Sequence, residues 1–324
     1  MNNYVSIVLP TYNEEKNVIP IIQEIVERNN EYNLEIIVVD DNSTDNTESL
    51  IRDISRIDSR VRLINRIDRF GLSSAIKEGC LNAHGDIIAV MDSDGQHEVT
   101  SLFKAIEFIS NNKEDLVIGS RFLDKSSIEG LSKKRKDGSS IANNIARVSL
   151  NNNYKTLTDY LSGFFLFKRY SCISIIKRID VNGFKFLYEL LALSKGRLKV
   201  CEVPLKFKPR KSGNSKLDIA VVWDFNISII HSFLGRLIPR RAISFGIVGL
   251  TGVFVQLTAL YFLLWITEFP FIKVLPFAVI VAACSNFFIN NLLTFKNKRL
   301  YGLSLCIGLI KFLLVSSLPL IANV

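Results

Sequence analysis

The sequence predicts an α/β head with a Rossmann-like, mainly parallel sheet, joined to a transmembrane helical part. Two observations predict the head: short runs rich in Val and Ile alternate with segments of helical periodicity, and polar clusters directly follow several of those runs. A third observation predicts the tail, because the last third of the chain is poor in charge although 22% of all residues are charged. The positive mean hydropathy of +0.24 reflects this uneven distribution.

Several apolar runs have the length and the β-branched composition of buried strands. They are residues 4–9, 34–39, 61–64, 86–91, 115–118 and 199–203. Helix-length connections between most of these runs predict parallel neighbours, with helices on both faces of the sheet. Ligands of such sheets bind beyond the carboxyl ends of the strands, so we expect the functional residues there.

The tail contains two windows without any charged side chain, residues 242–267 and 274–295, and each exceeds the roughly 20 residues that cross a bilayer as a helix. A third apolar stretch, 300–324, is interrupted by Lys311, so we expect a partial third span that begins near this residue. The expected divisions are a head at 1–216, an interfacial helix and linker at 217–241, and a transmembrane domain at 242–324.

Basic residues flank the two complete spans on their predicted inner side. They are Arg236, Arg240, Arg241, Lys296, Lys298 and Arg299. Under the positive-inside rule they predict a multi-pass protein of the cell membrane with its head on the cytoplasmic face. The first ten residues agree, because they read as a strand and lack the basic flank and cleavage site of a signal peptide.

Composition and missing motifs exclude several function classes. The five cysteines are scattered and only three histidines exist, which disfavours a disulfide framework or a structural zinc site. The formal charge of +9 is better explained by anionic headgroups or a phosphorylated substrate than by nucleic acid, because membrane spans are present. Common ATPases, dehydrogenases and hydrolases are disfavoured, since no Gly-Lys-Ser loop, G-x-G-x-x-G or nucleophile elbow occurs.

The clearest chemical signal follows the run at residues 86–91. Asp92 and Asp94 are two residues apart, so an extended backbone would point both carboxylates at one hard cation, with Gln96 as a further ligand. The alternative is a turn that caps a helix beginning near Val99. We expect Mg²⁺ or Mn²⁺ here, bridging a diphosphate and neutralising it as a leaving group.

The carboxyl ends of the first two runs carry a second polar cluster. Asp41 is one of two adjacent acidic residues, which is more than a helix cap needs. Its carboxylate could accept hydrogen bonds from a nucleobase or ribose. Tyr12 and Glu14 flank the same edge, with capping by Asn13 as the simpler alternative. His97 is expected to cap or orient rather than to act as a base.

Arginines and lysines in loops provide the positive charge that a diphosphate and an anionic acceptor require. They are Arg121, Arg135, Arg210 and Lys216. The basic stretch at 124–140 is expected to form a mobile lid or acceptor loop, followed by a helix at about 139–150 and a turn at 162–164.

In combination, six motifs resemble those of family 2 glycosyltransferases, and within that family the dolichol-phosphate mannosyltransferases (polyprenyl-phosphate mannose synthases). They are Leu9-Pro10-Thr11-Tyr12-Asn13-Glu14, Val39-Asp40-Asp41-Asn42-Ser43, Asp92-x-Asp94-x-Gln96-His97, Gly119-Ser120-Arg121, Asp159-x-x-Ser162-Gly163-Phe164 and Arg210-x-x-Gly213-x-Ser215-Lys216. The tail is similar to the GtrA-like membrane domain, which usually has four spans, so this member is expected to be truncated or short.

The resemblance implies a GT-A fold, GDP-mannose as donor, a divalent cation, and a polyprenyl phosphate as acceptor. It implies that Asp94 and Arg121 are catalytic and that Asp92, Asp94 and Gln96 hold the metal. The residues implied for donor binding are Pro10, Tyr12, Glu14, Val39, Asp41, Asp92, Ser93, Asp94, Arg121, Arg210 and Lys216, and those for the acceptor phosphate are Arg121, Arg135 and Ser139. Two places depart from the family pattern. The chain has Phe165 where Arg is common, and it has Lys125-Ser126-Ser127 where glycines are usual.

We therefore expect a membrane-anchored, inverting, metal-dependent transferase that moves mannose from GDP-mannose to dolichyl phosphate for glycosylation. An ionised phosphate monoester needs no enzyme base, which agrees with the lack of a catalytic histidine. One alternative is a UDP-glucose or other UDP-sugar donor. Another is a flippase or transporter of lipid-linked sugars whose head is regulatory.

Overall fold

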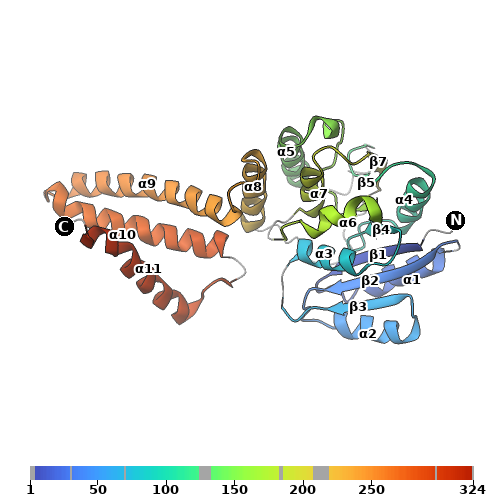
Figure 1. Cartoon of the computed structure of the whole chain (residues 1–324). Helices are drawn as coiled ribbons and strands as arrows, with labels where there is room; N and C mark the ends of the chain where they lie inside the picture. The colour runs from blue at the N-terminus through green and yellow to red at the C-terminus, as the bar shows by residue number, and fades with distance from the viewer. Residues whose placement is uncertain are drawn as a thin grey trace. The chain divides into compact units, whose positions relative to one another are not determined.

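The computed structural model describes residues 4–29, 31–68, 71–123, 133–181, 185–206, 219–295 and 298–322. The chain divides into two compact units, Met1–Lys216 and Leu217–Val324. The first unit is an α/β domain and the second is helical (Figure 1).

The first unit is built on one seven-stranded sheet with the order β3-β2-β1-β4-β6-β5-β7. All strands run in the same direction except β6, which is antiparallel to both β4 and β5. The strands are β1 (Tyr4–Thr11), β2 (Asn33–Asp40), β3 (Val61–Asn65), β4 (Ile87–Val90), β5 (Leu116–Ser120), β6 (Phe165–Lys168) and β7 (Val200–Pro204). The predicted fold class, with its mainly parallel sheet, is confirmed.

Helices cover both faces of the sheet (Figure 1). Those of the head are α1 (Val18–Arg28), α2 (Thr47–Ile57), α3 (Leu72–Asn82), α4 (Val99–Asn111), α5 (Lys133–Ser149), α6 (Arg169–Lys177) and α7 (Phe186–Ser194), with a short 3₁₀ turn, η2 (Asn152–Tyr154). The apolar periodicity of α1 and α4 explains their place, because each buries one stripe against the sheet.

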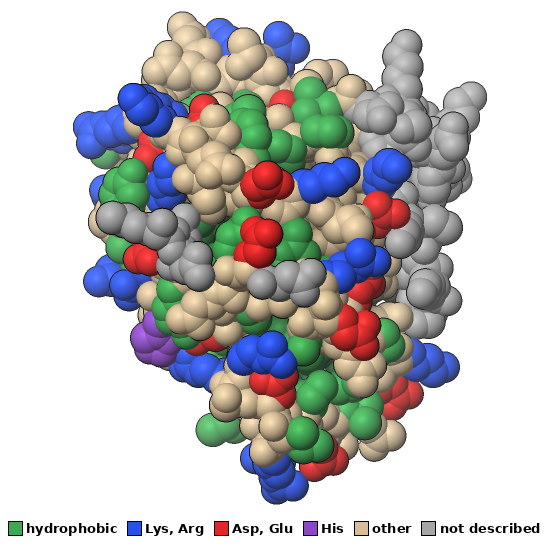
Figure 2. Space-filling model, turned by 90° about the vertical axis from the view of Figure 1, so that its right-hand side faces the viewer, with side chains coloured by type: hydrophobic (Ala, Val, Ile, Leu, Met, Phe, Trp, Pro, Cys, Tyr) green, Lys and Arg blue, Asp and Glu red, His purple; other side chains and the backbone are tan. Residues whose placement is uncertain are grey.

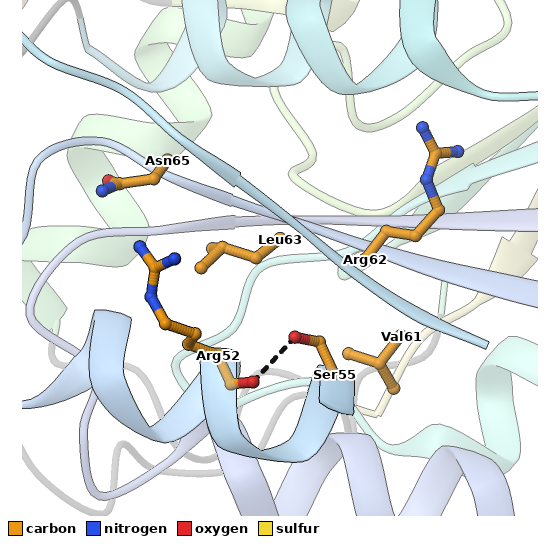
Figure 3. Close-up of a pocket in the computed structure, with 6 residues that line it drawn as sticks. All are labelled: Arg52, Ser55, Val61, Arg62, Leu63 and Asn65. Carbon is orange, nitrogen blue, oxygen red and sulfur yellow. Dashed lines mark hydrogen bonds between the residues drawn. The ribbon is translucent and has the colours of Figure 1, made fainter. Parts of the chain in front are cut away.

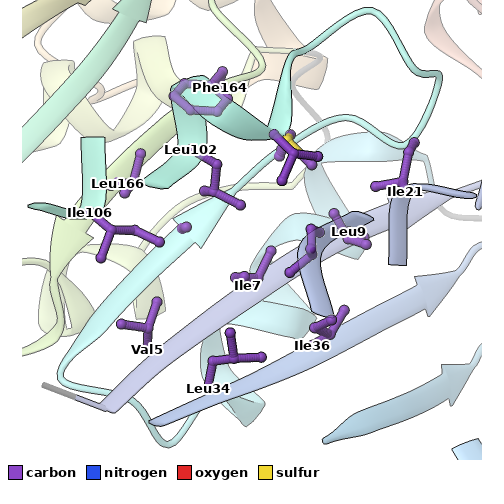
Figure 4. Packing of buried hydrophobic residues seen from close by; sticks show 14 of the residues in the cluster. Val5, Ile7, Leu9, Ile21, Leu34, Ile36, Leu102, Ile106, Phe164 and Leu166 are labelled. Carbon is purple, nitrogen blue, oxygen red and sulfur yellow. The ribbon is translucent and has the colours of Figure 1, made fainter. Parts of the chain in front are cut away.

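The alternation of β1 divides the core between the two layers. Val5, Ile7 and Leu9 point to the face that α1 and α4 cover, where they join one continuous apolar cluster (Figure 4). Val8 points to the opposite face, toward α3. A Cβ added at Gly79 of α3 would lie 2.4 Å from Val8 Cγ1, so this glycine lets the helix backbone approach the sheet.

Two features of the head differ from the sequence-based expectations. The turn at 162–164 leads directly into β6, a strand that the sequence analysis missed and that lies between β4 and β5. Helix α5 begins at Lys133, inside the stretch expected to be a loop, so Arg135 lies in a helix rather than in a loop.

The second unit contains α8 (Ile219–Phe233), α9 (Arg240–Ile266), α10 (Phe271–Ile289), the π-helix η3 (Asn290–Thr294) and α11 (Gly302–Ala322). Within the described residues, α9 and α10 with its continuation to Thr294 are long and apolar enough to cross a membrane. The two pack side by side as a hairpin (Figure 1). Helix α11 begins at Gly302, near the start of the third apolar stretch and before Lys311, near which the partial third span was expected to begin.

A chain of polar contacts holds the ends of these helices together. Trp223 of α8 donates its indole N–H to Ser244 of α9 at 3.0 Å, and Ser244 is 2.7 Å from Thr294. Thr294 in turn donates to the side chain of Asn290 at 2.8 Å. Close packing of α9 on α10 requires Gly252, where a Cβ would lie 2.4 Å from the Asn286 side chain.

Candidate functional site

The carboxyl ends of β1, β2, β4 and β5 meet at one edge of the sheet, because these strands share one direction. The polar clusters that follow these strands therefore converge, as the sequence analysis expected. Direct contacts join them: the amide of Asp41 donates to the carbonyl of Thr11 at 2.8 Å. The hydroxyl of Ser93 donates to the carbonyl of Pro10 at 2.9 Å.

The segment after β4 forms a compact turn around its acidic residues. Asp94 is buried, and one of its carboxylate oxygens accepts the backbone N–H of Gln96 at 3.1 Å. Asp92 remains partly exposed. Its carboxylate occupies space left by Gly163, because a Cβ at that position would lie 2.2 Å from Asp92 Oδ2. The turn at 162–164 thus determines where the Asp92 carboxylate can lie.

The loops after β1 and β2 hold each other in place. Asn13 adopts a left-handed backbone conformation with φ of 55°, and its side chain accepts the N–H of Thr44 at 2.8 Å. Its own N–H donates to Ser43 Oγ at 2.9 Å. Glu14 accepts from the Asn17 side chain at 2.7 Å, at the start of α1. Tyr12 lies between these anchored neighbours and is partly exposed.

Asp41 is buried and its carboxylate is oriented from two sides. Oδ1 accepts from Arg66 at 2.6 Å, and Oδ2 accepts the N–H of Gly71 at 2.8 Å. Arg66 also contacts Glu78 at 3.0 Å and is itself only 7% exposed. The sequence analysis missed Arg66, since nothing local marks it. Val39, another residue implied for the donor, is fully buried in β2.

Arg121 follows β5 and forms a two-pronged ion pair with Asp159. Its Nε and Nη2 donate to the two carboxylate oxygens at 2.7 and 2.9 Å, and the Asp159 side chain is completely buried. Although burial alone would lower the pKa of Arg121, the charge of Asp159 and its hydrogen bonds raise it. The guanidinium is therefore permanently charged and held in one orientation.

The loop that carries Asp159 is itself anchored by Glu202 of β7. Its carboxylate accepts the backbone N–H groups of Thr158 at 2.9 Å and of Asp159 at 2.8 Å. A third anchor comes from α5, where Asn143 Oδ1 accepts the N–H of Tyr160 at 2.9 Å. Strand β7 and helix α5 thus converge on the residue that orients Arg121.

Two further ionisable residues share this charged environment. Lys185, immediately before α7, interacts electrostatically with Arg121, Asp92 and Asp159, and burial followed by the Arg121 charge lowers its pKa to about 8. His97 packs edge to face on Phe164 with ring centroids 5.5 Å apart, and burial lowers its pKa to about 4. His97 is thus uncharged near neutral pH, and the sequence analysis gave Lys185 no role.

The remaining predicted residues lie on or beyond α5. Arg210 and Lys216 are outside the described residues, and of Arg135 only its place in the first turn of α5 is described. Ser139 is partly exposed on the same helix. The following residue, Ser140, lines a hollow of about 210 Å³, together with Phe122, Asn143, Asn144, Arg147, Leu157, Thr158 and Tyr160.

The donor set at the Asp92 turn fits a small divalent cation that is shared with a substrate. Mg²⁺ and similar ions are commonly held by one or two carboxylates, with phosphate oxygens and waters completing the shell. Asp92 and Asp94 supply such a pair. Among the described residues no group of three or more His, Cys, Asp or Glu could hold a metal, so this chain offers no all-protein cage there.

A larger hollow, of about 380 Å³, lies away from this edge between α2 and β3. It is lined by Arg52, Ser55, Val61, Arg62, Leu63 and Asn65 (Figure 3). The two guanidinium groups extend in different directions instead of converging, and Ser55 donates to the backbone carbonyl of Arg52 at 2.8 Å. None of the predicted site residues lines it.

The sheet of the head is of the GT-A type. The family model described as "Glycosyl transferase family 2" matches residues 6–176 of the chain. A second family model, described as "GtrA/DPMS, transmembrane domain", matches residues 244–324. The chain belongs to glycosyl transferase family 2 and is a glycosyltransferase with a GtrA-like, membrane-associated domain.

Two relatives illustrate the similarity. A dolichol-phosphate mannosyltransferase of Pyrococcus furiosus is 34% identical over 299 residues, which cover 91% of this chain and 82% of the relative. A dolichyl-phosphate beta-glucosyltransferase of Trichomonas vaginalis is 30% identical over 248 residues, which cover 70% of each chain.

Solved structures share the fold at lower identity. The glucosyl-3-phosphoglycerate synthase of Mycobacterium tuberculosis, in complex with Mn²⁺, UDP-glucose and phosphoglyceric acid, superposes with a TM-score of 0.54 at 22% identity. The match covers 71% of this chain and 79% of the synthase, and it confirms the arrangement of the sheet.

We predict that Gly163→Ala inactivates the protein without unfolding it. The new Cβ would overlap the Asp92 carboxylate and displace it, so we expect sugar transfer to fall at least about 100-fold. Initial rates with a saturating donor measure this. Gly249→Ala is the control, because apart from its chain neighbours and the nearby backbone of its own helix no heavy atom lies within 4 Å of the added Cβ. Equal rates for both variants would show that the room at Gly163 is irrelevant.

We also predict that Asp159→Asn destabilises the head. The change retains the volume of the side chain but leaves the Arg121 guanidinium without its buried counter-charge, which costs about 3 kcal/mol. The thermal unfolding midpoint should fall, and the double variant Arg121→Gln/Asp159→Asn should recover part of the loss. An unchanged midpoint in the single variant would contradict the importance of this pair.

Proposed function

We propose that this protein transfers mannose from GDP-mannose to dolichyl or another polyprenyl phosphate, with inversion at the anomeric carbon. The products are dolichyl phosphate mannose, which serves glycosylation, and GDP. The observation that carries the proposal is the 34% identity to a dolichol-phosphate mannosyltransferase, which extends over 91% of the chain and so includes both head and helices.

The acceptor fits a protein with apolar helices. A polyprenyl chain leaves a bilayer only at a cost of about 0.8 kcal/mol per exposed CH₂ group, so the enzyme has to work at the membrane surface. The α9–α10 hairpin provides an anchor there. Arg240 and Arg241 begin α9, and Lys298 and Arg299 follow the second span, which supports a multi-pass arrangement with a cytoplasmic head.

The residues of the charged edge have distinct roles in the proposed reaction. We assign guanosine binding to Asp41, Tyr12 and Glu14, together with Pro10 and Val39, at the carboxyl ends of β1 and β2. Ser93 anchors the turn that presents Asp92 and Asp94. Asp92 and Asp94, with Gln96 beside them, would hold Mg²⁺ or Mn²⁺, which when bound neutralises the diphosphate leaving group.

The acceptor phosphate supplies its own nucleophile. Its second ionisation occurs near pH 6, so at neutral pH an anionic oxygen can attack C1 of the sugar without an enzyme base. The new O–C1 bond forms on the face opposite the GDP, the C1–O bond to the diphosphate breaks, and GDP leaves with the electron pair. Arg121, fixed by Asp159, stabilises the negative charge of the phosphates, and Lys185 adds a second cation.

Arg210, Lys216, Arg135 and Ser139 complete the proposal as phosphate ligands. The first two would contact the donor, and Arg135 and Ser139, both on α5, would contact the acceptor phosphate. Ser139 precedes Ser140, which lines the hollow beside Thr158 and Tyr160. That hollow adjoins the loop of Asp159, so an acceptor phosphate held there would lie near Arg121.

A UDP-glucose donor is the second candidate. Two dolichyl-phosphate beta-glucosyltransferases of Trichomonas vaginalis are each 30% identical to the chain.

A donor screen tests the proposal. The purified full chain in detergent is given dolichyl phosphate, Mn²⁺ or Mg²⁺, and radiolabelled GDP-mannose or UDP-glucose in parallel. We expect an organic-soluble labelled lipid from GDP-mannose, absent when EDTA is added. Label transfer from UDP-glucose alone would establish the second candidate, and no transfer from either donor would overturn the proposal.

Asp94→Asn should remove metal-dependent turnover while the head stays folded. The variant keeps an oxygen for the Gln96 N–H but loses the charge that we assign to the cation, so kcat should fall at least about 100-fold. Mn²⁺-dependent initial rates measure this. The control is Asp53→Asn, an exposed carboxylate of α2 with 67% side-chain exposure, which should be as active as the wild type. A near-normal rate in Asp94→Asn would remove the assigned cation site.

A further inference from the structure

Two arginines of the β3 region each join a buried acid in or directly after β2 to helix α3. Near the amino end of the strand pair, Arg62 lies 2.6 Å from Glu35 and donates to the carbonyl of Asn82, the last residue of α3, at 3.3 Å. At the carboxyl end, Arg66 lies 2.6 Å from Asp41. Both acidic side chains are only 5% exposed. The two pairs have similar partners, but only the second lies at the edge where the predicted site residues converge.

The pair of Arg66 and Asp41 differs from the ion pairs of the head surface. On the side of the molecule that Figure 2 shows, many Lys and Arg side chains lie beside Asp or Glu side chains. The pair of Arg56 and Asp53 on α2 is exposed, with side chains 70% and 67% accessible, and such pairs contribute little to stability. The side chains of Arg66 and Asp41 are 6% and 5% exposed. Because burying two charges costs free energy, this pair requires an explanation besides stability.

The register of the sheet places Arg66 beside Asp41. Strands β2 and β3 are parallel, with Asp40 paired to Asn65 at their carboxyl ends. The N–H of Arg66 donates to the carbonyl of Asp40 at 3.1 Å, so the ladder continues one residue beyond β3. The next residues of the two segments, Asp41 and Arg66, are therefore neighbours at the end of the sheet.

The guanidinium of Arg66 is directed by three groups. Its Nη1 donates to Asp41 Oδ1 at 2.6 Å, and its Nη2 donates to Ser74 Oγ at 2.6 Å. Its Nε lies 3.0 Å from Glu78 Oε2. Ser74 and Glu78 are one turn apart on α3, and Gly71, directly before this helix, donates its N–H to Asp41 Oδ2 at 2.8 Å. A planar fork with each nitrogen at a different partner has one orientation, and it transmits that orientation to Asp41.

These contacts prepare the Asp41 carboxylate before any ligand arrives. A buried carboxylate keeps its charge only beside a counter-charge and hydrogen-bond donors, which Arg66 and the N–H of Gly71 supply. They hold one oxygen each and so fix the plane of the group. An acceptor that is already charged and oriented loses little freedom when a ligand binds, so more of the binding energy is retained.

We propose that Arg66 is a positioning residue for the donor nucleotide, which fixes the Asp41 carboxylate so that it accepts a ring N–H of the base. The inference rests on the proposed function, in which Asp41 binds the guanosine, and adds the residue that makes Asp41 an effective acceptor. Guanine and uracil each carry a ring N–H that can donate to a carboxylate. Adenine has an unprotonated ring nitrogen at the corresponding position, which an acceptor-only carboxylate repels. Loss of Arg66 should therefore weaken the binding of guanine and uracil nucleotides and spare that of adenine nucleotides.

Isothermal titration calorimetry on the purified full chain, in detergent with Mn²⁺, tests the inference without catalysis. The probes are GDP, UDP and ADP. We expect the wild type to bind GDP at least about tenfold more tightly than ADP. Arg66→Gln should lose this preference, because its affinity for GDP falls at least about tenfold while that for ADP is unchanged. If UDP binds more tightly than GDP, the same comparison is made with UDP.

Arg62→Gln is the matched control, since it breaks the corresponding pair at the other end of the same two strands. Both variants should lower the thermal unfolding midpoint, but Arg62→Gln should bind GDP as tightly as the wild type. A parallel loss of GDP and ADP affinity in Arg66→Gln, or an equal loss of GDP affinity in Arg62→Gln, would show that Arg66 only supports the fold and would overturn the inference.

A double-mutant cycle tests whether Arg66 acts through Asp41. When Arg66→Gln is added to Asp41→Asn, the GDP affinity should change less than about twofold, because the group that Arg66 positions is already lost. Losses that add in the double variant would contradict the inference. Arg66→Lys keeps the charge but not the planar fork, and it replaces Arg66→Gln if that variant does not fold. It should also lose GDP affinity and spare ADP, and an unchanged GDP affinity would overturn the inference.

The outcomes separate this inference from the proposed function. A wild type that binds GDP and UDP no more tightly than ADP would overturn both the role of Asp41 and that of Arg66. Normal GDP binding by Arg66→Gln would overturn the role of Arg66 alone and leave the proposed donor intact. If the chain transfers no sugar from any donor, the proposed function is wrong, while calorimetry with GDP still decides whether Arg66 positions Asp41.

Discussion

The candidate site depends on one buried ion pair, between Arg121 and Asp159. A carboxylate with no exposed surface is tolerated only when it is fully paired, and here both oxygens receive N–H groups of one guanidinium. Glu202 holds two amides of the same loop and Asn143 holds a third. Strands β5 and β7 and helix α5 therefore all determine the orientation of one cation at the edge of the sheet.

Space and charge are arranged around that cation from several distant parts of the chain. Gly163 leaves room for the Asp92 carboxylate, and Ser93 ties the acidic turn to the end of β1. Lys185 adds positive charge from the start of α7. The result is an edge that brings the Asp92 carboxylate into the same electrostatic environment as two cationic side chains, which suits a diphosphate together with a metal ion.

The sequence predicted the sheet and the strand-end clusters well because both are local: apolar runs determine strands, and parallel strands bring their carboxyl ends together. Strand β6 was missed because Phe165–Lys168 is too short for periodicity to separate it from the preceding turn, and its pairing partners are far away in the chain. Arg66 and Lys185 carry no local pattern; their roles follow from contacts across the fold.

Binding of Mn²⁺, followed by electron paramagnetic resonance, tests the central claim most directly. The account predicts that the wild-type chain binds one Mn²⁺ tightly only when GDP is present, because the diphosphate completes the shell begun by Asp92 and Asp94. It also predicts that Asp92→Asn loses this GDP-dependent binding while it remains folded. Equal GDP-dependent Mn²⁺ binding by the wild type and Asp92→Asn would show that the ion lies elsewhere and would contradict the account.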